Sequence, residues 1–110
     1  MTVRFRDATS ADVPAIIALL RDDALGAGRE IEDMTIYDTA FQKMKAEAAN
    51  HLIVGEIEGR VVATYQITFI SGLSLRASRR AQVESVRVAS DLRGQRIGEA
   101  LFADAESRAR

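Results

Sequence analysis

Two β-rich runs joined by a glycine turn constrain the fold of this chain more than any other feature. They span residues 51–58 and 60–71, and Gly59 lies between them in the sequence Glu58-Gly59-Arg60. The second run alternates two sets of side chains, one of which is Val61, Ala63, Tyr65, Ile67 and Phe69. A glycine turn between two such runs is the signal of an antiparallel hairpin. We therefore expect an antiparallel sheet to lie at the centre of the fold.

The segment before the hairpin predicts a short strand followed by a helix. Residues 3–7 alternate hydrophobic and charged side chains, as a short edge strand does. Thr9 and Asp12 have the spacing of a capping box, which opens a helix. The helix is expected to end near Leu25, because the glycines of a loop over 26–32 follow. Its apolar positions, at helical spacing, are Val13, Ile16, Ile17 and Leu20.

The rest of the chain predicts two more helices and one more strand. A helix is expected from about Met34 to Ala49, a polar loop over 72–78, a strand over 80–88 and a final helix after Gly94. The inward positions are Tyr37, Phe41, Met44 and Ala48 in the first of these helices, and Ile97, Leu101 and Ala105 in the last. The order β-α-α-β-β-β-α predicts a mixed α/β fold over residues 1–110. Its central, mostly antiparallel sheet is flanked by helices.

Composition excludes several classes of protein and of site. With 110 residues, 47% hydrophobic and 28% charged, the chain has the makeup of one ordinary globular domain. It has no cysteine and a single histidine, His51, so a disulfide scaffold, a thiolate zinc site and a cysteine nucleophile are excluded. We expect no metal. No apolar run approaches the ~20 residues of a membrane helix, and no signal peptide is evident at Met1. The expected location is the cytoplasm, away from membranes.

The net charge of -1 conceals two halves of opposite sign. Residues 1–58 hold six basic and eleven acidic side chains, whereas residues 59–110 hold nine arginines and five acidic side chains. Arginine suits bidentate binding of phosphate, although charge alone is equally typical of a solvated surface. Arg76, Arg79 and Arg80 form a cluster with no interleaved aromatic residue, so we expect no nucleic-acid partner.

The segment that carries chemistry is a strand that enters a glycine-containing turn and a helix. The turn reads Leu92-Arg93-Gly94-Gln95-Arg96-Ile97-Gly98. The first N–H groups of a helix lack internal partners, and the helix dipole is positive at that end, so a phosphate can be held there. Gly94 permits close approach of the backbone to a ligand, and Arg93 and Arg96 add charge. Taken alone, the same pattern also fits a tight turn with a small residue for packing.

This turn, the preceding segment Val83-Glu84-Ser85-Val86-Arg87-Val88 and the order of elements together resemble the GNAT superfamily of acetyl-CoA-dependent N-acyltransferases. The resemblance covers essentially the whole chain. The family's turn, Arg/Gln-x-x-Gly-x-Gly/Ala, maps onto residues 93–98, with Arg96 where a glycine is usual. We expect the Arg96 side chain to point outward and to add a charge near the phosphates.

The resemblance implies acetyl-CoA as co-substrate and assigns residues to it. Main-chain groups of Val86 and Val88 pair with the pantetheine arm as an extra strand would, and the amides of residues 93–99 hold the pyrophosphate. The assigned residues are Val86, Arg87, Val88, Arg93, Gly94, Gln95, Arg96, Gly98 and Glu99.

Glu84 lies at the strand position where many members of the family keep a general base. An amine is mostly protonated near neutral pH, and only its free lone pair attacks a thioester, so the reaction needs a group that takes the proton. We expect Glu84 to be a partly buried carboxylate with this role. The alternative is a structural glutamate at the strand edge, paired with Arg80 or Arg87.

The sequence therefore predicts an N-acetyltransferase that acts on the amine of a small molecule. Family members continue past the last helix with further strands and a helix bearing a tyrosine acid, which this chain does not contain; we expect it to be a fragment. The alternative is a non-catalytic GNAT fragment that acts through dimerisation or a partner chain. The open edge of the strand over 80–88 favours a homodimer. Acidic residues near the first loop hint at a cationic acceptor: Asp22, Asp23, Glu30 and Glu32.

Overall fold

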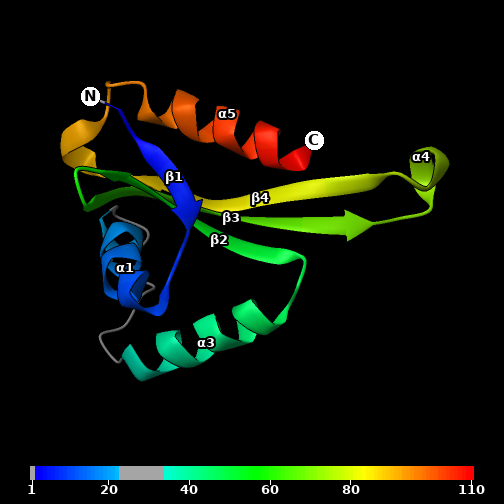
Figure 1. Ribbon diagram of the computed structural model, residues 1–110, viewed down its shortest axis with the longest axis horizontal. Coiled ribbons are helices and arrows are strands. Elements are labelled where there is room, and N and C mark those ends of the chain that lie inside the picture. The colour runs from blue at the N-terminus through cyan, green and yellow to red at the C-terminus, as the bar shows by residue number, and fades with distance from the viewer. Residues whose placement is uncertain (1, 23–33) are drawn as a thin grey trace.

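A four-stranded antiparallel sheet forms the centre of the molecule in the computed structural model, which describes residues 2–22 and 34–110 (Figure 1). The strands β1(Arg4–Asp7), β2(Asn50–Ile57), β3(Arg60–Ser71) and β4(Arg79–Val88) lie in the order of the sequence. This confirms the predicted sheet, with the N-terminal strand at one edge. The β2–β3 hairpin turns at Glu58 and Gly59, which have φ angles of 49° and 82°. Two successive positive φ angles are typical of a tight hairpin turn.

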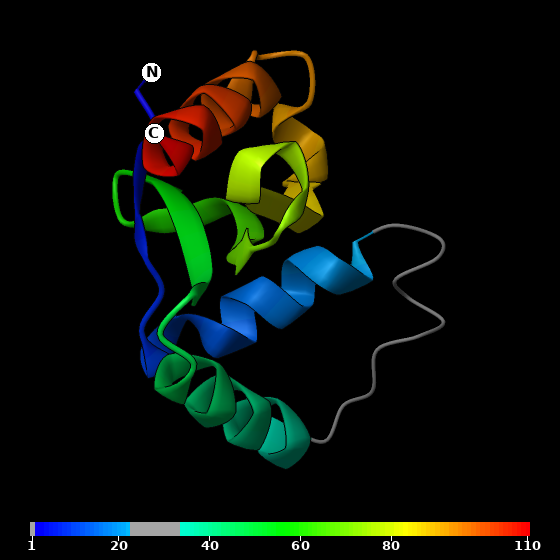
Figure 2. The same ribbon diagram turned by 90° about the vertical axis from the view of Figure 1, so that its right-hand side faces the viewer.

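Helices cover both faces of the sheet (Figure 2). α1(Val13–Arg21) and α3(Met34–Ala46) pack on one face, and α5(Ile97–Ala109) packs on the other. The inward positions predicted for α5, namely Ile97, Leu101 and Ala105, are all buried. The fold is therefore the predicted α/β arrangement, with two different helical layers around one sheet.

The capping box before α1 is present as predicted. The Asp12 carboxylate accepts a hydrogen bond of 2.7 Å from the Thr9 N–H, and it also accepts two hydrogen bonds from the Arg6 guanidinium. These contacts, that of Arg6 first, hold the pKa of Asp12 below its usual value. The box opens one turn of 3-10 helix over residues 10–12, and α1 follows directly.

Both helices on this face end earlier than predicted. α1 ends at Arg21 rather than near Leu25, and the carboxylate of the next residue, Asp22, accepts a hydrogen bond of 3.0 Å from the Ser90 N–H. Leu25 and the predicted loop over 26–32 lie outside the described residues. α3 ends at Ala46 instead of Ala49, since the chain reverses before β2. Ala48, predicted to face inward, is therefore exposed.

The β3–β4 hairpin extends away from the helices, as Figure 1 shows. Its tip, predicted as a polar loop, is the short turn α4(Ser74–Ala77), in which Leu75, Arg76 and Ala77 have positive φ angles. Leu73 and Leu75 are 93% and 83% exposed there.

Candidate functional site

The predicted site residues come together where β4 leads into α5. Glu84, Val86 and Val88 lie on β4, and residues 93–99 form the turn and first residues of α5. Within the described part of the chain, β4 pairs with β3 alone. One edge of β4 is consequently open along the predicted site.

A β-bulge interrupts β4 at the centre of this edge. Thr64 of β3 is paired with Arg87, whereas Gln66 is paired with Glu84. Two residues of β4, Ser85 and Val86, therefore lie opposite the single residue between Thr64 and Gln66. Ser85 has a φ of 55°, the left-handed conformation that absorbs an extra residue. The bulge changes which backbone groups of β4 face outward beyond it.

The bulge leaves the main-chain groups of Val86 and Val88 facing the open edge. The Ala89 N–H donates to the Val62 carbonyl of β3 over 2.8 Å, and Arg87 lies in register with Thr64. Successive residues of a strand direct their backbone groups to opposite sides, so those of Val86 and Val88 point away from β3. The Val86 carbonyl accepts a hydrogen bond of 2.9 Å from the Arg87 guanidinium. These groups lie where a further strand would pair.

The turn into α5 depends on two left-handed residues. Gly94 has a φ of 88°, and Arg96 has φ 62° and ψ 20° at the N-cap of α5. Glycine adopts this conformation without the steric cost that other residues meet. Arg96 therefore bears that cost at the position where the family motif has a glycine. Its side chain is exposed, as is that of Arg93.

The start of α5 presents backbone donors and open space. Its first intrahelical bond runs from the Ala100 N–H to the Arg96 carbonyl, at 3.2 Å. The N–H groups of residues 97–99 consequently have no carbonyl partner within the helix. A Cβ added at Gly94 or at Gly98 would meet nothing within 4 Å among the described residues. Packing of this part of the chain therefore does not require glycine at 98, so the small-residue alternative loses support there.

Glu84 is exposed, and not partly buried as predicted. It lies opposite Gln66 and so faces the side of the sheet that carries α1 and α3. The carboxylate is thus open to solvent on the face where the next feature lies.

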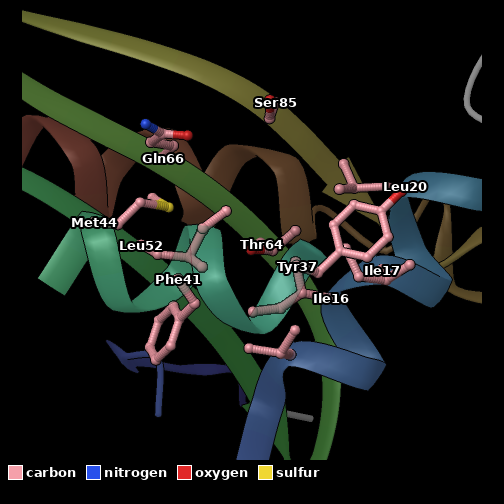
Figure 3. A pocket seen from close by; sticks show the side chains of 12 residues that line it. Ile16, Ile17, Leu20, Tyr37, Phe41, Met44, Leu52, Thr64, Gln66 and Ser85 are labelled. Carbon is pink, nitrogen blue, oxygen red and sulfur yellow. The ribbon is translucent and has the colours of Figure 1, made fainter. Parts of the chain in front are cut away.

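A cavity of about 140 Å³ lies between α1, α3 and this face of the sheet (Figure 3). Most of the lining that residues 2–22 and 34–110 provide is apolar, and none of it is charged. The lining comprises Val13, Ile16, Ile17, Leu20, Tyr37, Ala40, Phe41, Met44, Leu52, Thr64, Gln66 and Ser85. Sequence reasoning missed this cavity, because apolar residues at helical spacing predict a filled core equally well.

Two of the polar side chains that line the cavity donate hydrogen bonds to other residues of the sheet. The Thr64 hydroxyl donates to the Ile53 carbonyl at 2.9 Å, and the Gln66 amide donates to the Asn50 side chain at 2.9 Å. Ser85, at the bulge, adjoins Glu84 on β4. The cavity is thus apolar towards the helices and reaches β4 beside Glu84.

No group of three or more potential metal ligands occurs in the described ranges. Of the helices described, none is long and apolar enough to cross a bilayer.

Comparison with protein families gives a match over most of the chain. Residues 14–110 match the model described as the acetyltransferase (GNAT) family. A comparison with curated protein sequences gave no significant match.

Solved structures share this architecture. A transcriptional regulator from Bacillus halodurans C-125 has 36% identity and a TM-score of 0.92, over 97% of this chain and 73% of that one. Glucosamine-6-phosphate N-acetyltransferase from Arabidopsis thaliana has 22% identity and a TM-score of 0.75, over 99% and 78%. A predicted acetyltransferase with acetyl-CoA from Clostridium acetobutylicum has 17% identity and a TM-score of 0.69, over 97% and 75%. The last two likenesses concern the fold alone.

Proposed function

The chain belongs to the GNAT acetyltransferase family, and on that basis we propose that it transfers an acetyl group from acetyl-CoA to the amine of a small molecule. Glu84 is the proposed general base. The observation that carries the proposal is the meeting, at one place, of an open strand edge, an uncapped helix start and an exposed carboxylate.

The open edge of β4 and the start of α5 suit two parts of acetyl-CoA, the pantetheine arm and the pyrophosphate. Val86 and Val88 offer main-chain groups at the edge, which a pantetheine amide can pair with as a strand would. The N–H groups of residues 97–99 suit the pyrophosphate, and the exposed side chains of Arg93 and Arg96 add charge. The remaining assigned residues are Arg87, beside the valines, and Gly94, Gln95, Gly98 and Glu99, whose backbone forms the turn.

Bound acetyl-CoA supplies an acyl thioester, and the chain must orient the amine and remove its proton. Glu84 takes that proton as the amine nitrogen bonds to the acyl carbon, the carbon–sulfur bond of the thioester breaks, and coenzyme A leaves as a thiolate that takes up a proton from solvent. Its carboxylate lies one residue before the bulge, on the face that carries the cavity. This arrangement separates the two tasks, because the edge of β4 holds one substrate and the face of the sheet receives the other.

Gly98 gives the sharpest test of acetyl-CoA binding. A valine there extends into space that the described protein leaves empty, so the fold should persist while the pyrophosphate loses its place. We expect Gly98→Val to weaken coenzyme A binding by about tenfold or more, the cost of displacing hydrogen bonds to a charged group. Ala103→Val, at an exposed position of the same helix, is the control and should bind normally. Isothermal titration measures both, and normal affinity in Gly98→Val would refute the placement.

A second candidate function is supported by the open edge itself. Unpaired strand groups recruit other strands, so β4 favours assembly with a second copy or with a partner chain. In that case the chain acts through association and not through catalysis. Light scattering and an assay of coenzyme A release together distinguish the two functions. A dimer that releases no coenzyme A from acetyl-CoA with any amine favours association, whereas turnover favours the enzyme.

A further inference from the structure

We propose that the acceptor is a primary amine joined by a short linker to an apolar group about the size of a benzene ring, and that the cavity beneath α1 and α3 holds this group. The inference rests on the proposed function and names its acceptor class. It is carried by the size, the lining and the position of the cavity.

The size and lining of the cavity match such a group. Its volume is about 140 Å³, and Ile16, Ile17 and Leu20 of α1 face Phe41 and Met44 of α3 across it (Figure 3). Apolar cavities of about 150 Å³ lined by such side chains stay dry and bind benzene. A phenyl ring or a branched alkyl group therefore fits this space.

The position of the cavity fixes the direction of the amine. Helical side chains line its apolar part, and Thr64, Gln66 and Ser85 form the part along the sheet. Ser85 adjoins Glu84, the proposed base. An acceptor whose apolar group fills the cavity therefore extends its nitrogen along the sheet towards the open edge of β4, and a linker of one or two carbons suits this arrangement.

The same lining disfavours polar acceptors. Among the described residues, no charged side chain lines the cavity, and the Thr64 hydroxyl and Gln66 amide already donate within the sheet. Burial of a second ammonium group or of sugar hydroxyls without partners is unfavourable. Of the acidic residues that hinted at a cationic acceptor, Asp22 accepts a hydrogen bond from the Ser90 N–H, and Asp23, Glu30 and Glu32 lie outside the described residues.

Ala40 offers a variant that fills the cavity without removing an existing contact. It lines the cavity from α3 and is otherwise exposed. Ala40→Phe introduces a ring at the cavity, whereas Thr39→Phe adds the same ring at an exposed neighbouring position outside the lining. Thermal melting confirms that each variant folds.

The first experiment measures binding without catalysis. Toluene is titrated into the isotopically labelled chain, and the methyl signals of Met44, which lines the cavity, and of Met34, which does not, are followed by NMR. We expect a saturable shift at Met44 in the unmodified chain and in Thr39→Phe, and its loss in Ala40→Phe. Absence of any shift in the unmodified chain overturns the proposal, and this result does not depend on whether Ala40→Phe folds.

The second experiment measures acetyl transfer to phenethylamine, with spermidine and ethanolamine as polar competitors. We expect kcat/KM for phenethylamine to exceed that for either competitor by about tenfold or more, the effect of filling an apolar pocket, and to fall by a similar factor in Ala40→Phe alone. Turnover that prefers a polar amine and ignores Ala40→Phe overturns the acceptor class but leaves the proposed function intact. Toluene binding without turnover of any amine has the opposite meaning: the cavity binds as proposed, and the proposed function fails.

Discussion

The two faces of the sheet are packed in different ways. Tyr65, Ile67 and Leu101 are fully buried on the face that carries α5, and the Tyr65 hydroxyl donates to Asp104, which also pairs with Arg108 at 2.7 Å. Burial, together with this hydrogen bond, raises the pKa of Tyr65. The opposite face has a smaller buried cluster, centred on Val13, Ile17 and Phe41, beside the cavity. One face is therefore built for stability, and the other leaves room for a ligand.

The largest expected effect is on the chemistry of the open face. Glu84→Gln keeps the shape of the side chain and removes its basicity, so kcat should fall by about 10²–10⁴ while the affinity for acetyl-CoA stays the same. Glu106→Gln, on an exposed position of α5, is the control. Steady-state kinetics over a range of pH checks this, and an unchanged pH–rate profile in Glu84→Gln would remove Glu84 from the mechanism.

The next largest effect is on stability, and it compares a leucine from each face of the sheet. Leu101 is fully buried against the sheet, whereas Leu20 is half-buried beside the cavity. Leu101→Ala should lower the free energy of unfolding by about 3 kcal/mol, and Leu20→Ala by about 1 kcal/mol. The second loss is smaller because the Leu20 side chain buries less apolar surface than the Leu101 side chain does. Chemical denaturation measures both. Equal losses would show that the two faces do not differ as described.

The smallest effect concerns the turn at which β4 leads into α5. Arg96→Gly removes the steric strain of an arginine in the left-handed conformation. We expect this gain in stability to exceed slightly the entropy that a new glycine adds to the unfolded chain. Arg93, with φ -63°, gains nothing from the same change, so Arg93→Gly should be destabilising. We expect the two variants to differ in unfolding free energy by about 1 kcal/mol. A less stable Arg96→Gly would mean that the arginine makes a compensating contact.

The elements of the fold were predictable because each depends on local pattern. The Glu58-Gly59 turn, the capping box at Thr9 and the inward face of α5 were all found from spacing, and the structure confirms them. The predicted end of α1 was wrong: the helix ends at Arg21, and the Asp22 carboxylate accepts a hydrogen bond from the N–H of Ser90, which is distant in sequence. Interactions of this kind leave no local signal.

The candidate site was predictable only in part, for the same reason. Arg93, Gly98 and the strand before them carry the family motif, so their place in the fold followed from the sequence. The bulge at Ser85 depends on pairing with β3, and the cavity depends on the distance between α1 and α3. The exposure of Glu84 likewise depends on what covers β4, and no spacing within the strand encodes it.

The most direct test of the account maps coenzyme A onto the backbone by NMR. The account predicts that adding coenzyme A shifts the amide signals of Val86, Val88 and residues 97–99, at the open edge of β4 and the start of α5. The amides of β1, at the opposite edge of the sheet, should stay unchanged. Shifts centred on β1, or no shifts under conditions that saturate a known GNAT acetyltransferase, would contradict the claim that this edge holds the acyl donor.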